Sequence, residues 1–120
     1  MEQINPLVSD AMNVLEQIKF KKGYYPLMCE GKKTQTMRLA RKRLDVQEGD
    51  VALAVFPGMD KTLLLKIRKV GYKQFKSIGL DDAVREGFES VADLKNELLK
   101  IYPIINKWDR LYYYQFEVVR

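Results

Sequence analysis

Residues 30–39, EGKKTQTMRL, carry two lysines, two threonines and an arginine whose spacing suits chemistry on a hydroxyl group or binding of an anion. Period-two alternation places Thr34, Thr36 and Arg38 on one face of a strand. A threonine hydroxyl becomes a nucleophile only when a base takes its proton. Lys33 is a candidate base if burial and nearby positive charge lower its pKa. A solvent-facing polar strand would carry the same residues, so both interpretations stay open.

Two absences narrow the chemistry. The chain has no histidine, which excludes Ser-His-Asp and Cys-His arrangements and any metal bound by histidine. Its one cysteine, Cys29, excludes thiolate zinc sites and an internal disulfide, and we expect it to be a small core residue. A Mg²⁺ site made of carboxylates alone stays open, but no paired-acid motif points to one, so we expect no metal and no cofactor. The base of an enzyme would be Lys, Asp, Glu or Tyr.

The positive charge is segregated along the chain. The formal net charge is +5, yet residues 31–44 and 61–80 contain basic residues and no acid. If these segments lie together in the fold, they form a face suited to phosphate, and the predicted partner is RNA or a nucleotide. Two solvated strand faces that lack acids are the alternative. The residues of the first segment assigned to phosphate binding are Lys32, Arg38, Arg41, Lys42 and Arg43.

Length and composition indicate one globular domain. The chain has 120 residues, of which 47% are hydrophobic and 31% charged. It has no apolar run near the ~20 residues that span a bilayer, and its first residues do not resemble a signal peptide. We expect a cytoplasmic protein that acts away from membranes, as a monomer.

The predicted elements are short. We expect a helix over 6–17, strands over 18–21 and 34–39, and one or two helical turns between them, ended at Gly31. Further strands are expected over 51–56, 62–75 and 111–119, and helices over 80–88 and 91–102, the last capped by Ser90. This order predicts an α+β fold, a small mixed β-barrel with flanking helices.

Four segments together resemble the ASCH domain family. They are YPLMCEGKKTQTMRLARKR, VQEGDVALAVF, DDAVREGFESVADLKNELLKIYP and YYYQFEVV, which follow one another over roughly residues 18–119. The resemblance implies a PUA-like barrel with a cleft and an RNA-related function. It also implies that residues 18–120 form the domain, while residues 1–17 form a helical extension packed on the barrel.

The layout is similar to that of one branch of the family, the bacterial amidohydrolases that deacylate N4-acetylcytidine. That resemblance implies Thr36 as nucleophile, Lys33 as its base and Glu86 as the orienting carboxylate. Arg38 would face a phosphate or a developing oxyanion. Departures from that branch are residues 1–17, the basic cluster at residues 41–43, and the Gly-Phe pair that follows the glutamate.

Three hypotheses follow. A binding module would hold RNA or a modified nucleoside in the cleft, with Tyr24, Tyr25 and Thr34 among the residues that line it. An enzyme would hydrolyse an N4-acylated cytosine, or cleave RNA as a ribonuclease with the same cleft. An accessory domain would use the cleft for neither.

Overall fold

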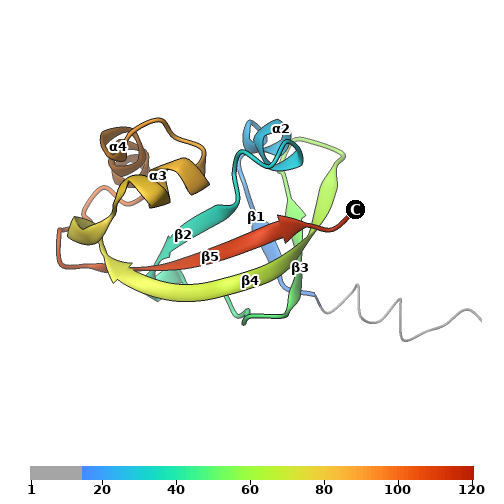
Figure 1. Cartoon of the computed structure of the whole chain (residues 1–120), viewed down its shortest axis with the longest axis horizontal. Helices are drawn as coiled ribbons and strands as arrows, with labels where there is room; N and C mark the ends of the chain where they lie inside the picture. The colour runs from blue at the N-terminus through green and yellow to red at the C-terminus, as the bar shows by residue number, and fades with distance from the viewer. Residues whose placement is uncertain (1–14) are drawn as a thin grey trace, which may run out of the picture.

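The computed structural model describes residues 15–120, which form a curved sheet with helices at one end and across its top (Figure 1). The elements in chain order are β1 (Gln17–Lys19), α2 (Tyr24–Cys29), β2 (Gln35–Leu39), η1 (Ala40–Lys42), β3 (Val51–Val55), β4 (Thr62–Gln74), η2 (Phe75–Ser77), α3 (Leu80–Glu86), α4 (Val91–Ile101) and β5 (Arg110–Val118). Most of the helix predicted over 6–17 lies outside the described residues. Its last residue, Gln17, belongs to β1 instead.

The five strands form one mixed sheet in the order β1-β3-β4-β5-β2. β1 runs parallel to β3, and the other neighbours are antiparallel. The apolar run VALAV became the inner strand β3, and the long segment from Thr62 became one strand of 13 residues. The α+β class and the mixed sheet predicted from the sequence are therefore confirmed.

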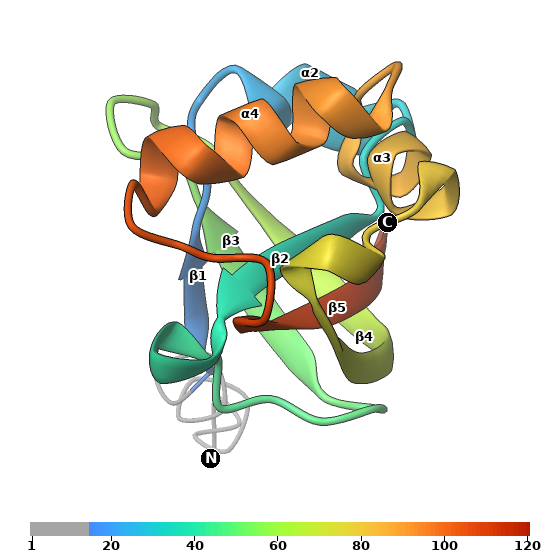
Figure 2. The same ribbon diagram turned by 90° about the vertical axis from the view of Figure 1, so that its left-hand side faces the viewer.

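The sheet does not close into the predicted barrel, because the two edge strands do not pair with each other. β1 and β2 end the sheet on opposite sides, and the curvature of the sheet brings them toward one another (Figure 2). The Arg38 side chain connects them, with Nη2 donating to the carbonyl oxygen of Lys19 at 2.9 Å. One side-chain hydrogen bond therefore connects β1 and β2, which have no backbone hydrogen bonds between them. We call the gap between these two edge strands the open seam.

Two hydrophobic cores lie on the two faces of β5. Tyr114 and Phe116 belong to the core inside the curved sheet, together with Ile18 and Phe56. Leu111 belongs to a second core, which residues of β2, α3 and α4 complete. Period-two alternation explains this division, since successive side chains of a strand point to opposite faces.

The helices α3 and α4 are bounded by capping residues. The Ser90 side chain accepts a hydrogen bond from the Asp93 amide at 3.0 Å, as expected for the start of α4. Gly87 ends α3 in the left-handed conformation, with φ of 93°. Glu86 is therefore the last residue of α3, and the turn at Gly87 fixes where its side chain points.

Candidate functional site

A cavity of about 220 Å³ lies at the open seam, between the sheet edges and α4. We call it the seam cavity. Its residues come from β1 and the chain after it, α2, the start and middle of β2, and helices α3 and α4. Its lining includes Lys19, Phe20, Lys21, Tyr24, Lys33, Thr36, Arg38, Glu86, Phe88, Leu94, Glu97, Leu98 and Tyr102. Segments far apart in the sequence thus contribute to one site.

Lys33 and Glu86 form a buried ion pair in this cavity. Lys33 Nζ lies 3.1 Å from Glu86 Oε1 and 3.2 Å from the Glu86 carbonyl oxygen. The two residues are only 3% and 4% exposed. The other carboxylate oxygen, Glu86 Oε2, is buried with no hydrogen-bond partner among the described residues. Such an oxygen is a ready acceptor for a ligand N–H or O–H group.

Burial changes the protonation of both partners. It lowers the pKa of Lys33, and the nearby charge of Arg38 lowers it further, while Glu86 acts in the opposite direction. Burial raises the pKa of Glu86, and the charge and hydrogen bond of Lys33 oppose that change. Both shifts reduce the energetic difference between the ion pair and its neutral form. A proton can therefore be exchanged here more easily than between exposed groups.

Thr36 and Arg38 form the second polar pair of the cavity. Arg38 Nε donates to Thr36 Oγ1 at 3.1 Å, and the guanidinium carbon lies 5.5 Å from the centre of the Phe20 ring. They share one face of β2, as the alternation predicted, while Met37 and Leu39 pack in the second core. The hydroxyl of Thr36 retains its own proton for donation, because it accepts from Arg38.

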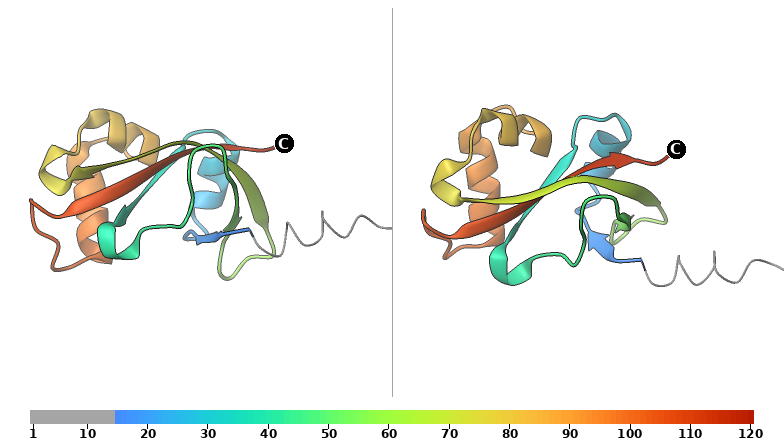
Figure 3. Two further views of the ribbon diagram at one scale, coloured as in Figure 1. Left: turned by 90° about the horizontal axis from the view of Figure 1, so that it is seen from below. Right: turned by 60° about the horizontal axis from the view of Figure 1, so that its bottom comes forward.

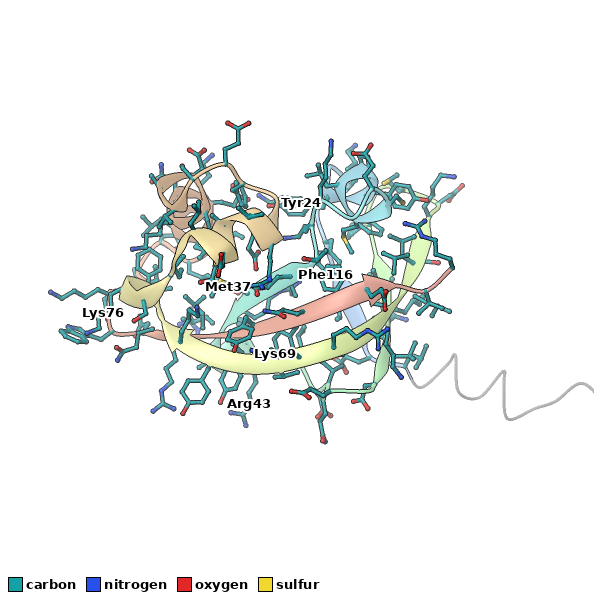
Figure 4. All side chains as sticks on the ribbon, viewed as in Figure 1. Tyr24, Met37, Arg43, Lys69, Lys76 and Phe116 are labelled. Atoms are coloured by element: carbon teal, nitrogen blue, oxygen red, sulfur yellow. The ribbon has the colours of Figure 1, made fainter. Side chains whose placement is uncertain are left out.

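Tyr24, which is labelled in Figure 4, adds an aromatic wall to the cavity. Lys33 Nζ lies 4.4 Å from the centre of the Tyr24 ring. Burial raises the pKa of Tyr24 to about 12, helped by the charges of Glu97 and Glu86. The phenol therefore stays protonated at neutral pH and can donate a hydrogen bond.

Sequence reasoning missed the ion pair that crosses the cavity. Lys21, after β1, pairs with Glu97 of α4, with Nζ and Oε2 2.5 Å apart. A signal was present, since Glu97 lies three residues after Leu94 and four before Ile101, next to the apolar stripe of its helix. The pairing partner, however, is 76 residues away.

A buried polar network supports the cavity from behind β2. Gln35 Nε2 donates to Asp82 Oδ1 at 3.2 Å, and Lys73 Nζ lies 2.8 Å from Asp82 Oδ2. The hydrogen bonds from Gly79, Lys73 and Gln35 hold the pKa of Asp82 below its usual value, although burial opposes them. This network connects β2 to α3 and so fixes the distance between Lys33 and Glu86.

Two residues predicted for the cleft, and one predicted for phosphate binding, do not line the seam cavity. Tyr25 packs edge-on against Phe56 at 5.2 Å between ring centres, so it belongs to the first core. Thr34 is held by its backbone, with its amide donating to Arg85 and its carbonyl accepting from Phe116. Lys32 is exposed and pairs with Glu30 at 3.3 Å. Placement beside the motif in sequence did not bring these side chains into the site.

The basic cluster at the end of β2 also lies outside the cavity. Arg41 and Lys42 are in η1, Arg43 follows it, and all three are exposed. Arg38 alone of the predicted phosphate-binding residues lines the cavity. The two acid-free segments lie on either side of β5, since β2 and β4 both pair with that strand.

Solved structures with similar folds belong to several bacteria. The ASCH domain from Lactobacillus crispatus matches with a TM-score of 0.73 and 18% identity, over 96% of this chain and 86% of that one. A DUF984 protein from Enterococcus faecalis matches with a TM-score of 0.67 and 19% identity, over 96% and 83%. The S128A mutant of an ASCH protein from Zymomonas mobilis matches with a TM-score of 0.60 and 11% identity, over 87% of this chain and 70% of that one.

The chain has the ASCH-domain fold. No protein family and no curated protein matches the sequence itself. The likeness thus lies in the ASCH fold and in the motifs quoted above. In the part of the chain that the structure describes, no helix is long and apolar enough to cross a membrane.

Proposed function

We propose that the seam cavity binds the base of a nucleoside or nucleotide, free or within RNA. The observation that carries the proposal is the buried, unpartnered Oε2 of Glu86 inside a cavity with aromatic and aliphatic walls. An amino group or ring N–H of a base supplies the donor that this oxygen lacks. Phe20, Tyr24 and the apolar face of α4 would contact the flat surfaces of the base.

The charge of the lining supports a phosphorylated ligand. Lys19, Lys21, Lys33 and Arg38 line the cavity with only two acids, a formal excess of two positive charges. Arg38 can hold a phosphate through Nη1, because its Nε and Nη2 already donate to Thr36 and Lys19. The volume of about 220 Å³ lies below the range of drug-sized pockets and suits a small ligand.

Calorimetric titration with cytidine, cytidine monophosphate and N4-acetylcytidine tests the binding proposal. We expect Glu86→Gln to weaken binding of the base about tenfold or more, because a charged acceptor is lost. Glu89→Gln, an exposed neighbour outside the cavity, is the matched control and should bind normally. If the wild-type protein binds none of the three ligands, the proposal is rejected.

Hydrolysis of an N4-acyl amide is the second candidate function. It is favoured by the lowered pKa of Lys33 in the same cavity as the Thr36 hydroxyl. Thr36 Oγ1 would attack the acyl carbonyl carbon while neutral Lys33 takes its proton. The C–N bond then breaks, the cytosine N4 receives that proton, and water releases the acid from the acyl-threonine.

The hydrolytic step needs a movement of Lys33, since its ammonium contacts Glu86 here and Thr36 contacts Arg38. Catalytic hydrogen bonds commonly tighten only when substrate is bound. Release of acetate from N4-acetylcytidine tests the step, with Thr36→Ala inactive and Thr36→Ser partly active. A wild-type protein that binds this nucleoside without releasing acetate would reject hydrolysis and leave binding. Cleavage of a labelled RNA, lost in the same variants, would instead support the ribonuclease.

A further inference from the structure

Two tyrosines and two arginines form a cluster on the sheet, away from the seam cavity. Tyr72 of β4 and Tyr112 of β5 are partners in the register, with ring centres 5.7 Å apart and planes inclined by 45°. The guanidinium carbon of Arg110 lies 4.9 Å from the centre of the Tyr72 ring. That of Arg43 lies 5.8 Å from the centre of the Tyr112 ring. We call these four residues the aromatic–arginine cluster.

The cluster lies on a part of the sheet that no α-helix covers. Leu111 and Tyr113 face the second core under α3 and α4, so Tyr112 between them faces the other way. Seen from below, these ends of β4 and β5 have the helices behind them and no α-helix in front (Figure 3). Arg43 lies below β4 and β5, whereas Tyr24 of the seam cavity lies above them (Figure 4).

The cluster is positively charged, and Tyr72, Arg43 and Arg110 are exposed, whereas Tyr112 is half-buried with one side against the first core. Tyr72 is 57% exposed, which is unusual for a ring whose role is only to fill a core. Among residues 15–120, neither Arg43 nor Arg110 pairs with a carboxylate, whereas Arg68 pairs with Glu117. The adjacent acid, Asp109, accepts from the amide of Asn106 in its own loop. Arg41 and Lys42 add exposed positive charge beside Arg43.

We infer that the aromatic–arginine cluster binds single-stranded nucleic acid, with bases stacked on Tyr72 and Tyr112 and phosphates held by Arg43 and Arg110. Exposed aromatic rings with interleaved arginines are the pattern that suits such strands, because every base has a face that can stack. Duplex nucleic acid has no free base faces and suits this surface less. The strands of the two acid-free segments both pair with β5, and these segments contribute Arg43 and Tyr72 to the cluster.

Fluorescence anisotropy with labelled 12-residue oligouridylate and oligodeoxyuridylate, and with a duplex, tests this inference. Both single strands should bind more tightly than the duplex, and the ratio of their affinities identifies the preferred sugar. Replacing Tyr72 by leucine keeps an apolar side chain but removes the stacking ring, and should weaken binding about 5- to 150-fold. An unchanged affinity in Tyr72→Leu, or equal affinity for the duplex, would overturn the inference.

A matched pair of double variants separates this surface from general positive charge. Arg43→Gln/Arg110→Gln should weaken binding and make the plot of log affinity against log salt concentration shallower, by about 0.7 for each phosphate that is no longer neutralised. Arg68→Gln/Arg120→Gln removes the same charge elsewhere and should have a much smaller effect. Equal losses of affinity in the two variants would contradict a localised site.

The two proposed binding sites can be tested separately, because each has its own variant and its own ligand. Glu86→Gln changes the seam cavity, so it should weaken binding of cytidine monophosphate, and it should affect the oligonucleotide less than Tyr72→Leu does. Tyr72→Leu should in turn leave binding of cytidine monophosphate unchanged. If Glu86→Gln abolished oligonucleotide binding and Tyr72→Leu did not, the strand would lie in the cavity and the cluster would have no role in binding.

Discussion

At the scale of single residues, the Lys33–Glu86 pair costs stability that an apolar pair would not. Two buried charges lose their hydration, and their mutual attraction offsets this loss only in part. Glu86 Oε2 also lacks the partner that a purely structural pair would be expected to have. Such an arrangement is typical of functional sites, where stability is given up for chemistry or binding.

We predict that replacing one partner of this ion pair lowers the free energy of unfolding more than replacing both partners does. Lys33→Met leaves the Glu86 carboxylate buried alone and should lower the free energy of unfolding by about 3–5 kcal/mol at pH 7. The double variant Lys33→Met/Glu86→Leu should recover most of the loss. Urea denaturation measures both, and Lys32→Met, beside it but exposed, should change stability by less than about 0.5 kcal/mol. A double variant no more stable than Lys33→Met would contradict the prediction.

The same variant has a defined pH dependence. Burial raises the pKa of Glu86, and Lys33→Met removes the ammonium that opposes the rise. The folded state therefore holds a proton on Glu86 more tightly than the unfolded state does. The free energy of unfolding of Lys33→Met is lower than that of the wild type, and this difference should shrink as the pH falls. The change should occur between the raised pKa of Glu86 and the ordinary glutamate value of ~4.3. A deficit that stays constant or grows between pH 7 and 4 would show that the missing charge is not its cause.

At the scale of elements, the end of α3 decides where the carboxylate lies. Gly87 has φ of 93°, and a Cβ atom there would meet Leu27 and Lys33 only at ordinary contact distances. Backbone strain, not crowding, is thus the cost of a side chain. Gly87→Ala should lower the free energy of unfolding by about 1 kcal/mol, as measured by thermal denaturation. Gly23→Ala is the control, since Gly23 has a helical backbone and open space, and equal losses in the two variants would refute the argument.

At the scale of the whole molecule, Arg38 connects the two edges of an open sheet. β1 has three residues and one strand neighbour, so its stability depends on few contacts. Arg38→Met should increase hydrogen exchange of the Phe20 amide, which donates to Val55, by about tenfold or more. Arg68→Met removes a surface ion pair with Glu117 and should leave this amide unchanged. Unaltered exchange in Arg38→Met would mean that β1 is held without the arginine.

The sequence alone determined the local features. Alternation placed Thr36 and Arg38 on one face of β2, and the capping residue Ser90 marked the start of α4. These features depend on neighbours within a few residues, so periodicity and capping chemistry suffice to predict them. The motif at residues 30–39 also identified Lys33, Thr36 and Arg38, all of which line the cavity.

Only the tertiary structure decided what those residues meet. It left the sheet open between β1 and β2, turned Tyr25 and Thr34 away from the site, and brought Glu97 to Lys21. It also set Arg43 and Arg110 beside the Tyr72–Tyr112 pair, on the face of the sheet opposite α3 and α4. Register, sheet curvature and burial arise from contacts between distant segments, so the spacing of residues within one segment cannot predict them.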